Sequence, residues 1–263
     1  MKKVLCAVLS LTLAAGVLSA CGKKATQGGD VQDNTVQSGT VTKAPDATPN
    51  TAESIPSQFK ATGSNITESA DGGVEVAVEE REGEERYTFD TEDLGFVDTT
   101  TGAIIKIGMT VDEVESLIGA PIRVDSSSAR IYSGIVVLYD DNGTVEQLIV
   151  GAGNMNEGDD PGRFVTPRGV QLYTTLDQFK AVYGDEYNAP AEPEEGDTSI
   201  KSTATMAVRY YAKDGDNFTY LGESYTNENK PENDKDLIMQ TFLFSTESNQ
   251  VSVMSIKSGT QVN

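Results

Sequence analysis

The spacing of apolar residues predicts two similar helical segments in the second half of the chain. Residues 104–119 and 169–184 align without a gap at an offset of 65 residues. In each segment, apolar residues recur at helical spacing, after a T-x-x-E/Q capping box and before a glycine that stops the helix. The capping boxes are Thr110 with Glu113 and Thr175 with Gln178, and the stop glycines are Gly119 and Gly184. The apolar stripes are Val111, Val114, Leu117 and Ile118 in the first segment, and Leu176, Phe179, Val182 and Tyr183 in the second.

Runs rich in β-branched and aromatic residues follow each helical segment, and polar turns separate them. Asn142-Gly143 is a strong β-hairpin signal. The predicted strands are 130–139, 144–150, 203–212, 218–223, 237–245 and 250–257. The pattern therefore predicts an α+β fold of two tandem units, 103–168 and 169–263, each a short helix followed by an antiparallel β-meander.

The region before these units shows weaker patterns. Valines alternate with other residues in 73–79, and Arg86–Phe89 could pair with them across a turn at Arg81–Glu84, which predicts an N-terminal β-hairpin extension over 71–102. A partly ordered extension is the alternative, because one face is almost wholly glutamate. Residues 21–70 are rich in small polar residues without apolar periodicity, so we expect a disordered linker.

Residues 1–20 have the features of a secretory signal, with Lys2 and Lys3 before an apolar run. The ending Leu18-Ser19-Ala20-Cys21 resembles the bacterial lipoprotein signal, or lipobox. That resemblance implies cleavage before Cys21 and acylation of its thiol, which would anchor the protein by lipid at the extracytoplasmic face of the cell membrane. An ordinary signal peptide with a chance cysteine is the alternative.

Composition narrows the possible functions. The chain has 263 residues with 20 Lys+Arg and 41 Asp+Glu, and removing residues 1–20 moves the formal net charge from −21 to −23. Such acidity excludes nucleic acid as a partner and favours cations or a protein with a basic patch, although it can also serve solubility alone. The absence of histidine excludes Ser-His-Asp and Cys-His catalysis. Cys6 and Cys21 are the only cysteines, so a mature disulfide is not expected.

The segment Ile107-Gly108-Met109-Thr110, with Glu113-Val114 and a later Gly119-Ala120-Pro121 turn, resembles the repeat of the β-lactamase inhibitory protein. It is also similar to the small lipoproteins of the outer-membrane barrel-assembly machinery. The resemblance covers about 104–257 and implies a module that binds proteins rather than an enzyme. The second unit departs from the pattern, because Tyr173 stands where the glycine belongs.

The other motifs give little support for an enzymatic or metal-binding function. Ser57-Gln58-Phe59-Lys60 and Lys257-Ser258-Gly259 match fragments of the penicillin-recognising signature, but the serine lies in the expected linker. Asp140–Gly143 lacks the remaining ligands of an EF-hand and is better explained as a hairpin turn. The carboxylates of 153–163 could hold calcium loosely. We assign no catalytic residue, cofactor or metal ligand.

Tyrosines on the predicted strands are the best candidates for contacting a partner, because tyrosine buries a large area at low entropic cost. Tyr210 and Tyr211 are adjacent and must point to opposite faces of a strand, so we expect one in the core and the other exposed. Ordinary sheet packing is the alternative. Together with Asp141 and Asp214 in the hairpin turns, they form the predicted partner-binding site. The sequence thus favours a non-enzymatic, membrane-anchored protein-binding or envelope-assembly module, with a small-ligand or cation-binding lipoprotein as the alternative.

Overall fold

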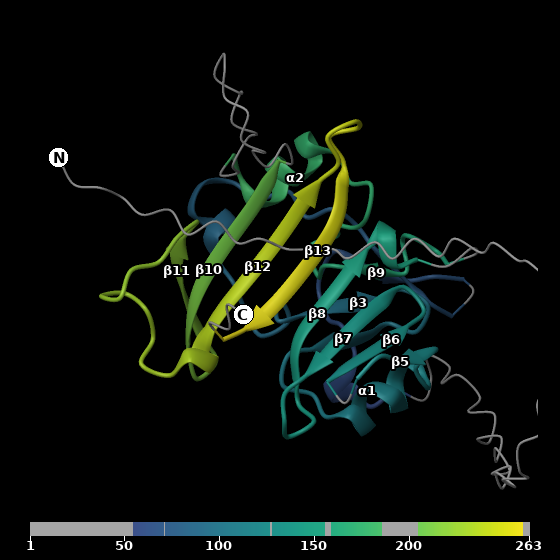
Figure 1. The fold of residues 1–263 in the computed structure, drawn as a ribbon. Helices are drawn as coiled ribbons and strands as arrows, with labels where there is room; N and C mark the ends of the chain where they lie inside the picture. Colours follow the sequence, from purple (N-terminus) through teal and green to yellow (C-terminus); the bar gives the residue numbers. More distant parts are fainter. Residues whose placement is uncertain (1–54, 71, 127, 156–158, 186–204, 260–263) are drawn as a thin grey trace, which may run out of the picture. The chain divides into compact units, whose positions relative to one another are not determined.

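The computed structural model describes residues 55–70, 72–126, 128–155, 159–185 and 205–259, and these residues are mainly β (Figure 1). They contain thirteen strands and two α-helices, with short 3-10 turns between them. The strands are β1 (Ile66–Glu68), β2 (Val74–Val76), β3 (Gly95–Asp98), β4 (Ala103–Lys106), β5 (Arg123–Val124), β6 (Ala129–Tyr132), β7 (Ile135–Tyr139), β8 (Val145–Gly151), β9 (Phe164–Val165), β10 (Met206–Asp214), β11 (Asn217–Gly222), β12 (Leu237–Phe244) and β13 (Val251–Ser258). The helices are α1 (Val111–Ile118) and α2 (Leu176–Tyr183).

One antiparallel sheet of eight strands dominates the fold, in the order β11-β10-β12-β13-β8-β7-β6-β5. Strand β13 pairs with β8 from Val253↔Gly151 to Lys257↔Gln147, and this pairing joins the two halves of the sheet. The prediction of an α+β fold with two tandem helix-plus-meander units is therefore wrong. The reason is that β8 and β13 satisfy each other's backbone groups, so the two meanders merge into one continuous sheet.

The helical segments have the local structure expected from the sequence. Thr110 Oγ1 accepts a hydrogen bond from Glu113 N at 3.3 Å, and Glu113 Oε2 accepts one from Thr110 N at 2.8 Å, so the first capping box is confirmed. Thr175 and Gln178 form the second in the same way. The start of each helix also bonds to a hairpin turn: Val111 N donates to Gly143 O, and Leu176 N donates to Asn249 O.

A single hydrophobic cluster fills the space between the helices and one face of the large sheet. Leu117 of α1 and Phe179 of α2 are both buried in it, together with Val137 and Phe242 from the sheet. The three-stranded sheet β4-β3-β9 adds Phe96 and other residues to the same cluster. The other face of the large sheet, which we call the outer face, is turned away from this core.

The N-terminal part of the fold differs from the predicted arrangement. Strand β2 pairs with β1, with Ile66 opposite Val76, whereas residues 83–87 form a 3-10 turn, so the expected hairpin with Arg86–Phe89 is wrong. The linker expected over 21–70 is also wrong for residues 55–70, because Ile55 is buried and β1 lies there. Their few apolar residues are too widely spaced to produce a periodic signal.

Two arginines lie within the core, which the charge pattern does not predict. Arg168 makes a two-point contact with Asp93, and both side chains are at most 3% exposed. Burial raises the pKa of the Asp93 carboxyl, an effect that Arg168 opposes. Arg209 has no carboxylate partner in the described structure. It donates to Tyr211 Oη and to backbone carbonyls, and its guanidinium lies 4.9 Å from the centre of the Tyr220 ring.

Candidate functional site

The two hairpins expected beside the partner-binding site lie at one end of the large sheet. Four antiparallel steps separate β10 from β7, so the two strands run in the same direction and their hairpin turns share an end. The Asp140–Gly143 turn is confirmed, because Gly143 N donates to Asp140 O at 2.9 Å. Asp141 and Asp214 are both exposed there. The structure therefore places the two acidic turns at the same end of the sheet, with three strands between them.

An ion pair links this end of the sheet. Lys235 lies in the 3-10 turn Asp234–Asp236 before β12, and its Nζ contacts Asp140 Oδ2 at 2.8 Å. This hydrogen bond, helped by the backbone N–H of Thr144, lowers the pKa of Asp140 to about 2. The carboxylate of Asp140 therefore already accepts hydrogen bonds from Lys235 and from the backbone of its own turn.

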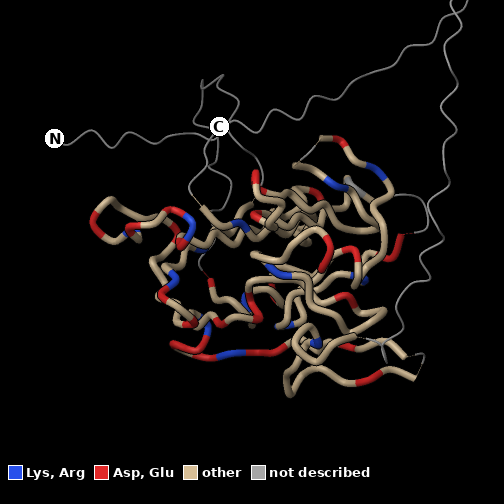
Figure 2. Tube along the Cα trace, turned by 90° about the horizontal axis from the view of Figure 1, so that it is seen from below, with Lys and Arg blue, Asp and Glu red and all other residues tan. Residues whose placement is uncertain are grey.

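Acidic residues outnumber basic ones around this end, which we call the acidic rim. Figure 2 shows acidic positions, in red, in many segments of the trace. The acidic residues of the rim are Asp140, Asp141, Asp214, Asp216, Glu232, Asp234 and Asp236, and the basic residues are Lys213, Lys230, Lys235 and Lys257. A surface of this kind attracts a positively charged partner.

The two adjacent tyrosines of β10 point to opposite faces, as predicted. Tyr211 is completely buried and accepts a hydrogen bond from Arg209 Nε at 2.9 Å, so it is a core residue. Tyr210 lies on the outer face and is half-buried, because Tyr225 packs edge-on against its ring at a centroid distance of 5.0 Å. Burial also raises the pKa of Tyr210. Of the two, only Tyr210 is placed to contact a partner.

The remaining strand tyrosines serve the core. Tyr132 and Tyr139 are buried, and their hydroxyl oxygens lie 3.0 Å apart in a hydrogen bond. Tyr220 is half-buried over the Arg209 guanidinium. The alternative of ordinary sheet packing therefore explains these three residues.

The outer face carries an apolar surface that single-strand patterns do not predict. Figure 1 looks onto this face, with the dark-blue N-terminal segments behind the sheet. Its side chains are mostly apolar, and most of them are only partly buried. The pairing register aligns them in rows across β10, β12, β13, β8, β7 and β6, which are interrupted in the middle by Thr241, Ser255, Lys257 and Gln147. The apolar members include Met206, Val208, Tyr210, Met239, Leu243, Val253, Ile149, Val136, Leu138 and Ile131. Gln147 and Ser255 share a hydrogen bond of 2.9 Å at the seam between β8 and β13.

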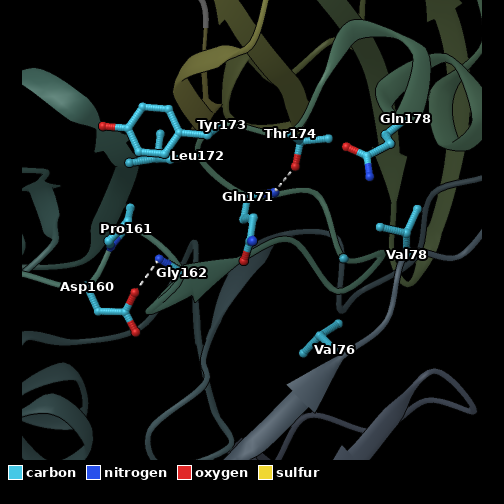
Figure 3. Close-up of a pocket in the computed structure, with 11 residues that line it drawn as sticks. Val76, Val78, Asp160, Pro161, Gly162, Gln171, Leu172, Tyr173, Thr174 and Gln178 are labelled. Atoms are coloured by element: carbon cyan, nitrogen blue, oxygen red, sulfur yellow. Dashed lines mark hydrogen bonds between the residues drawn. The ribbon is translucent and has the colours of Figure 1, made fainter.

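A pocket of about 370 Å³ lies elsewhere, between β2 and the turn that precedes α2 (Figure 3). Tyr173 forms one wall, and its side chain is 50% exposed. Its backbone φ is +66°, which is unusual for a residue with a side chain. The sequence contained the signal for this residue, because Tyr173 occupies the position of Gly108 in the first helical segment, where φ is +91°.

Several predicted features remain outside the described residues or without support there. Cys21 and the signal segment are not described. Part of the acidic 153–163 loop is described, and there Asp159 accepts a hydrogen bond from Ser133 Oγ, whereas Asp160 caps the turn at Gly162. Within the described ranges, no group of three or more acidic or cysteine side chains is arranged to hold a metal ion. Those ranges also contain no helix that is long and apolar enough to cross a membrane.

Comparisons with known proteins identify no family for this chain. No family model matches the chain, and neither a curated protein nor a solved structure matches it at a significant level.

Proposed function

We propose that this protein is a lipid-anchored, extracytoplasmic module that binds another protein through the outer face of its eight-stranded sheet. The observation that carries the proposal is the combination of an apolar outer face with an acidic rim at its hairpin end. Soluble proteins seldom expose broad contiguous apolar patches unless these serve binding. The apolar rows would supply the buried contact, and the rim would speed encounter with a basic partner.

The proposed partner presents an apolar surface flanked by Lys or Arg. Tyr210 is the expected anchor, because its ring lies on the outer face close to the rim. Met239 sits directly opposite it on β12, and Lys257 and Gln147 continue the same row on β13 and β8. The Cys21 anchor would hold the module at the membrane surface, which fits a role in envelope assembly.

Site-specific crosslinking tests the proposal. A photoreactive amino acid at Thr241, in the middle of the outer face, should capture one specific envelope protein in cells, whereas the same group at the exposed Thr67 of β1 should not. The captured protein is then purified and titrated. Binding should weaken as salt rises and should fall about tenfold or more in Val136→Asp, because that change places a charge in the apolar contact. Equal capture at both positions, or binding indifferent to Val136→Asp, would overturn the proposal.

A further inference from the structure

The pocket beside Tyr173 is a second candidate binding site, in addition to the outer face. The turn that carries it is rigid. Tyr173 N donates to Val251 O at 2.8 Å, and Val251 N donates to Thr174 O at 2.9 Å, so the start of β13 holds the turn on both sides. Leu172 and Thr174 are buried. The side chain of Tyr173, between these two buried residues, is exposed, as is that of Gln171 at the start of the turn.

Keeping a tyrosine here costs stability. A left-handed backbone conformation is unfavourable for a residue with a Cβ, whereas glycine adopts it freely. Gly108 shows that the same local structure forms with glycine in the first segment. Within the described part of the chain, the Tyr173 ring makes no aromatic or cation–π contact that would offset this cost. A strained, half-exposed aromatic residue on a rigid turn is typical of a ligand-contacting position.

The side chains that line the pocket narrow the chemical class of ligand that it can bind. Figure 3 shows Tyr173 and Asp160 on one side of the pocket, Gln171 between the walls, and Val76, Val78 and Gln178 on the other side. The described lining contains no Lys or Arg, and it includes the carboxylate of Asp160, so it does not suit an anion. Its volume lies at the small end of the range of about 300–1,000 Å³ that is usual for small-molecule sites.

A neutral saccharide matches this lining best. The exposed face of the Tyr173 ring can pack against the apolar C–H face of a pyranose ring. The Gln171 amide both donates and accepts hydrogen bonds, as sugar hydroxyls require, and Asp160 Oδ2, the oxygen that is not bonded to Gly162 N, can accept from one of them. A cationic group fits less well. Figure 3 shows the Asp160 carboxylate turned toward Gly162, to which it is hydrogen-bonded at 2.8 Å, rather than over the face of the Tyr173 ring.

We infer that the pocket formed by Tyr173, Asp160, Gln171 and Gln178 binds a neutral saccharide unit, with Tyr173 as the stacking platform. This site is separate from the outer face, so its failure would not affect the proposed protein contact.

The experiment screens the full chain against an array of neutral oligosaccharides, including N,N′,N″-triacetylchitotriose and cellotriose, with glucuronate as the anionic probe and arginine amide as the cationic probe. The strongest neutral binder is then titrated by calorimetry. Tyr173→Asn removes the ring but keeps a residue that tolerates positive φ. It should weaken binding about tenfold or more and should not lower the unfolding temperature. Ile122→Asn, a change at another exposed apolar residue away from the pocket, is the matched control and should bind normally.

Three outcomes would overturn the inference. The first is an array in which no neutral saccharide binds. The second is saccharide binding that Tyr173→Asn leaves unchanged. The third is arginine amide binding that depends on Tyr173 in the absence of saccharide binding, which would show a cation site. A lower unfolding temperature in Tyr173→Asn would show that the tyrosine serves the fold instead.

Discussion

Arg168 Nε donates to Asp93 Oδ1 at 2.9 Å, and this pair links the turn before β3 to the loop before α2. The side chains of Arg168 and Asp93 are 1% and 3% exposed. Arg168 also donates to the backbone carbonyl of Thr88, whereas its Nη1 has no partner within the described structure. The ion pair therefore joins two segments that are 75 residues apart in the sequence, and its charged groups are buried away from water.

Removing either member of this pair should destabilise the protein strongly. Arg168→Met or Asp93→Leu leaves the other charge buried without its counter-ion, which typically costs about 3–5 kcal/mol. Urea unfolding of each variant measures the loss. Arg123→Gln is the control, because Arg123 and Asp125 form an exposed pair that should contribute little to stability. Similar losses for the buried and exposed pairs would contradict this reading.

The two helices should respond unequally to truncation of their leucines. Leu117 is 1% exposed, so Leu117→Ala should cost about 2–5 kcal/mol. The sequence alone predicts a similar loss for Leu176→Ala, but Leu176 is only partly buried, and we expect a smaller effect. Phe179 is the fully buried residue of α2, and Phe179→Ala should cost about 3–5 kcal/mol. Denaturant unfolding of the three variants would decide the order.

The capping threonines should contribute similarly to stability, since the two capping boxes have the same geometry. Thr110→Ala and Thr175→Ala should each lower the free energy of unfolding by about 0.5–2 kcal/mol. Thr67, on the exposed edge of β1, provides a threonine control whose replacement by alanine should have little effect. A loss confined to one helix would mean that only one capping box supports the fold.

The Lys235–Asp140 contact predicts a specific dependence of stability on pH. The pKa of Asp140 is lowered from 3.8 to about 2, first by the Lys235 hydrogen bond. A carboxyl whose pKa is lower in the folded state stabilises that state above its unfolded pKa, and this contribution is lost as pH falls from about 4 to about 2. Asp140→Asn should therefore flatten the pH profile of stability in this range. Asp141→Asn, the same change at the adjacent exposed position, is the matched control.

The lipid anchor is tested at Cys21. If the proposed anchor is right, Cys21→Ala should abolish incorporation of labelled palmitate and leave an uncleaved or wrongly sorted precursor, because the cysteine of a lipobox is the acylated residue. Cys6→Ala, within the expected signal segment, is the matched control and should be labelled normally. Labelling of Cys21→Ala at the level of the parent would exclude the anchor.

Short-range structure could be predicted because its causes lie within a few residues. Thr110 and Glu113 are three positions apart, and the Asn142-Gly143 turn sets the β7–β8 hairpin directly. The opposite orientations of Tyr210 and Tyr211 follow from strand geometry alone.

Long-range pairing could not be predicted in the same way. Nothing in the sequence around Ile149 specifies that Ser255 will lie beside it, and a meander that ends at β8 looks complete by itself. Strand alternation predicts an outer face beside the two hairpins. It does not predict the apolar rows on that face, because they become visible only when six strands are aligned. The pocket depends on a turn, on β2 and on Asp160, which meet only in the folded chain.

The position of β13 has a consequence for how the protein reaches its folded state. Strand β13 lies between β12 and β8 in the sheet, although it comes last among the strands in sequence. Until residues 251–258 have been made, β8 presents an open strand edge, and such edges invite pairing with other chains. Contacts this distant in sequence also form slowly. We therefore expect the incomplete chain to need protection from pairing with other chains, even though the finished fold leaves no such edge at β8.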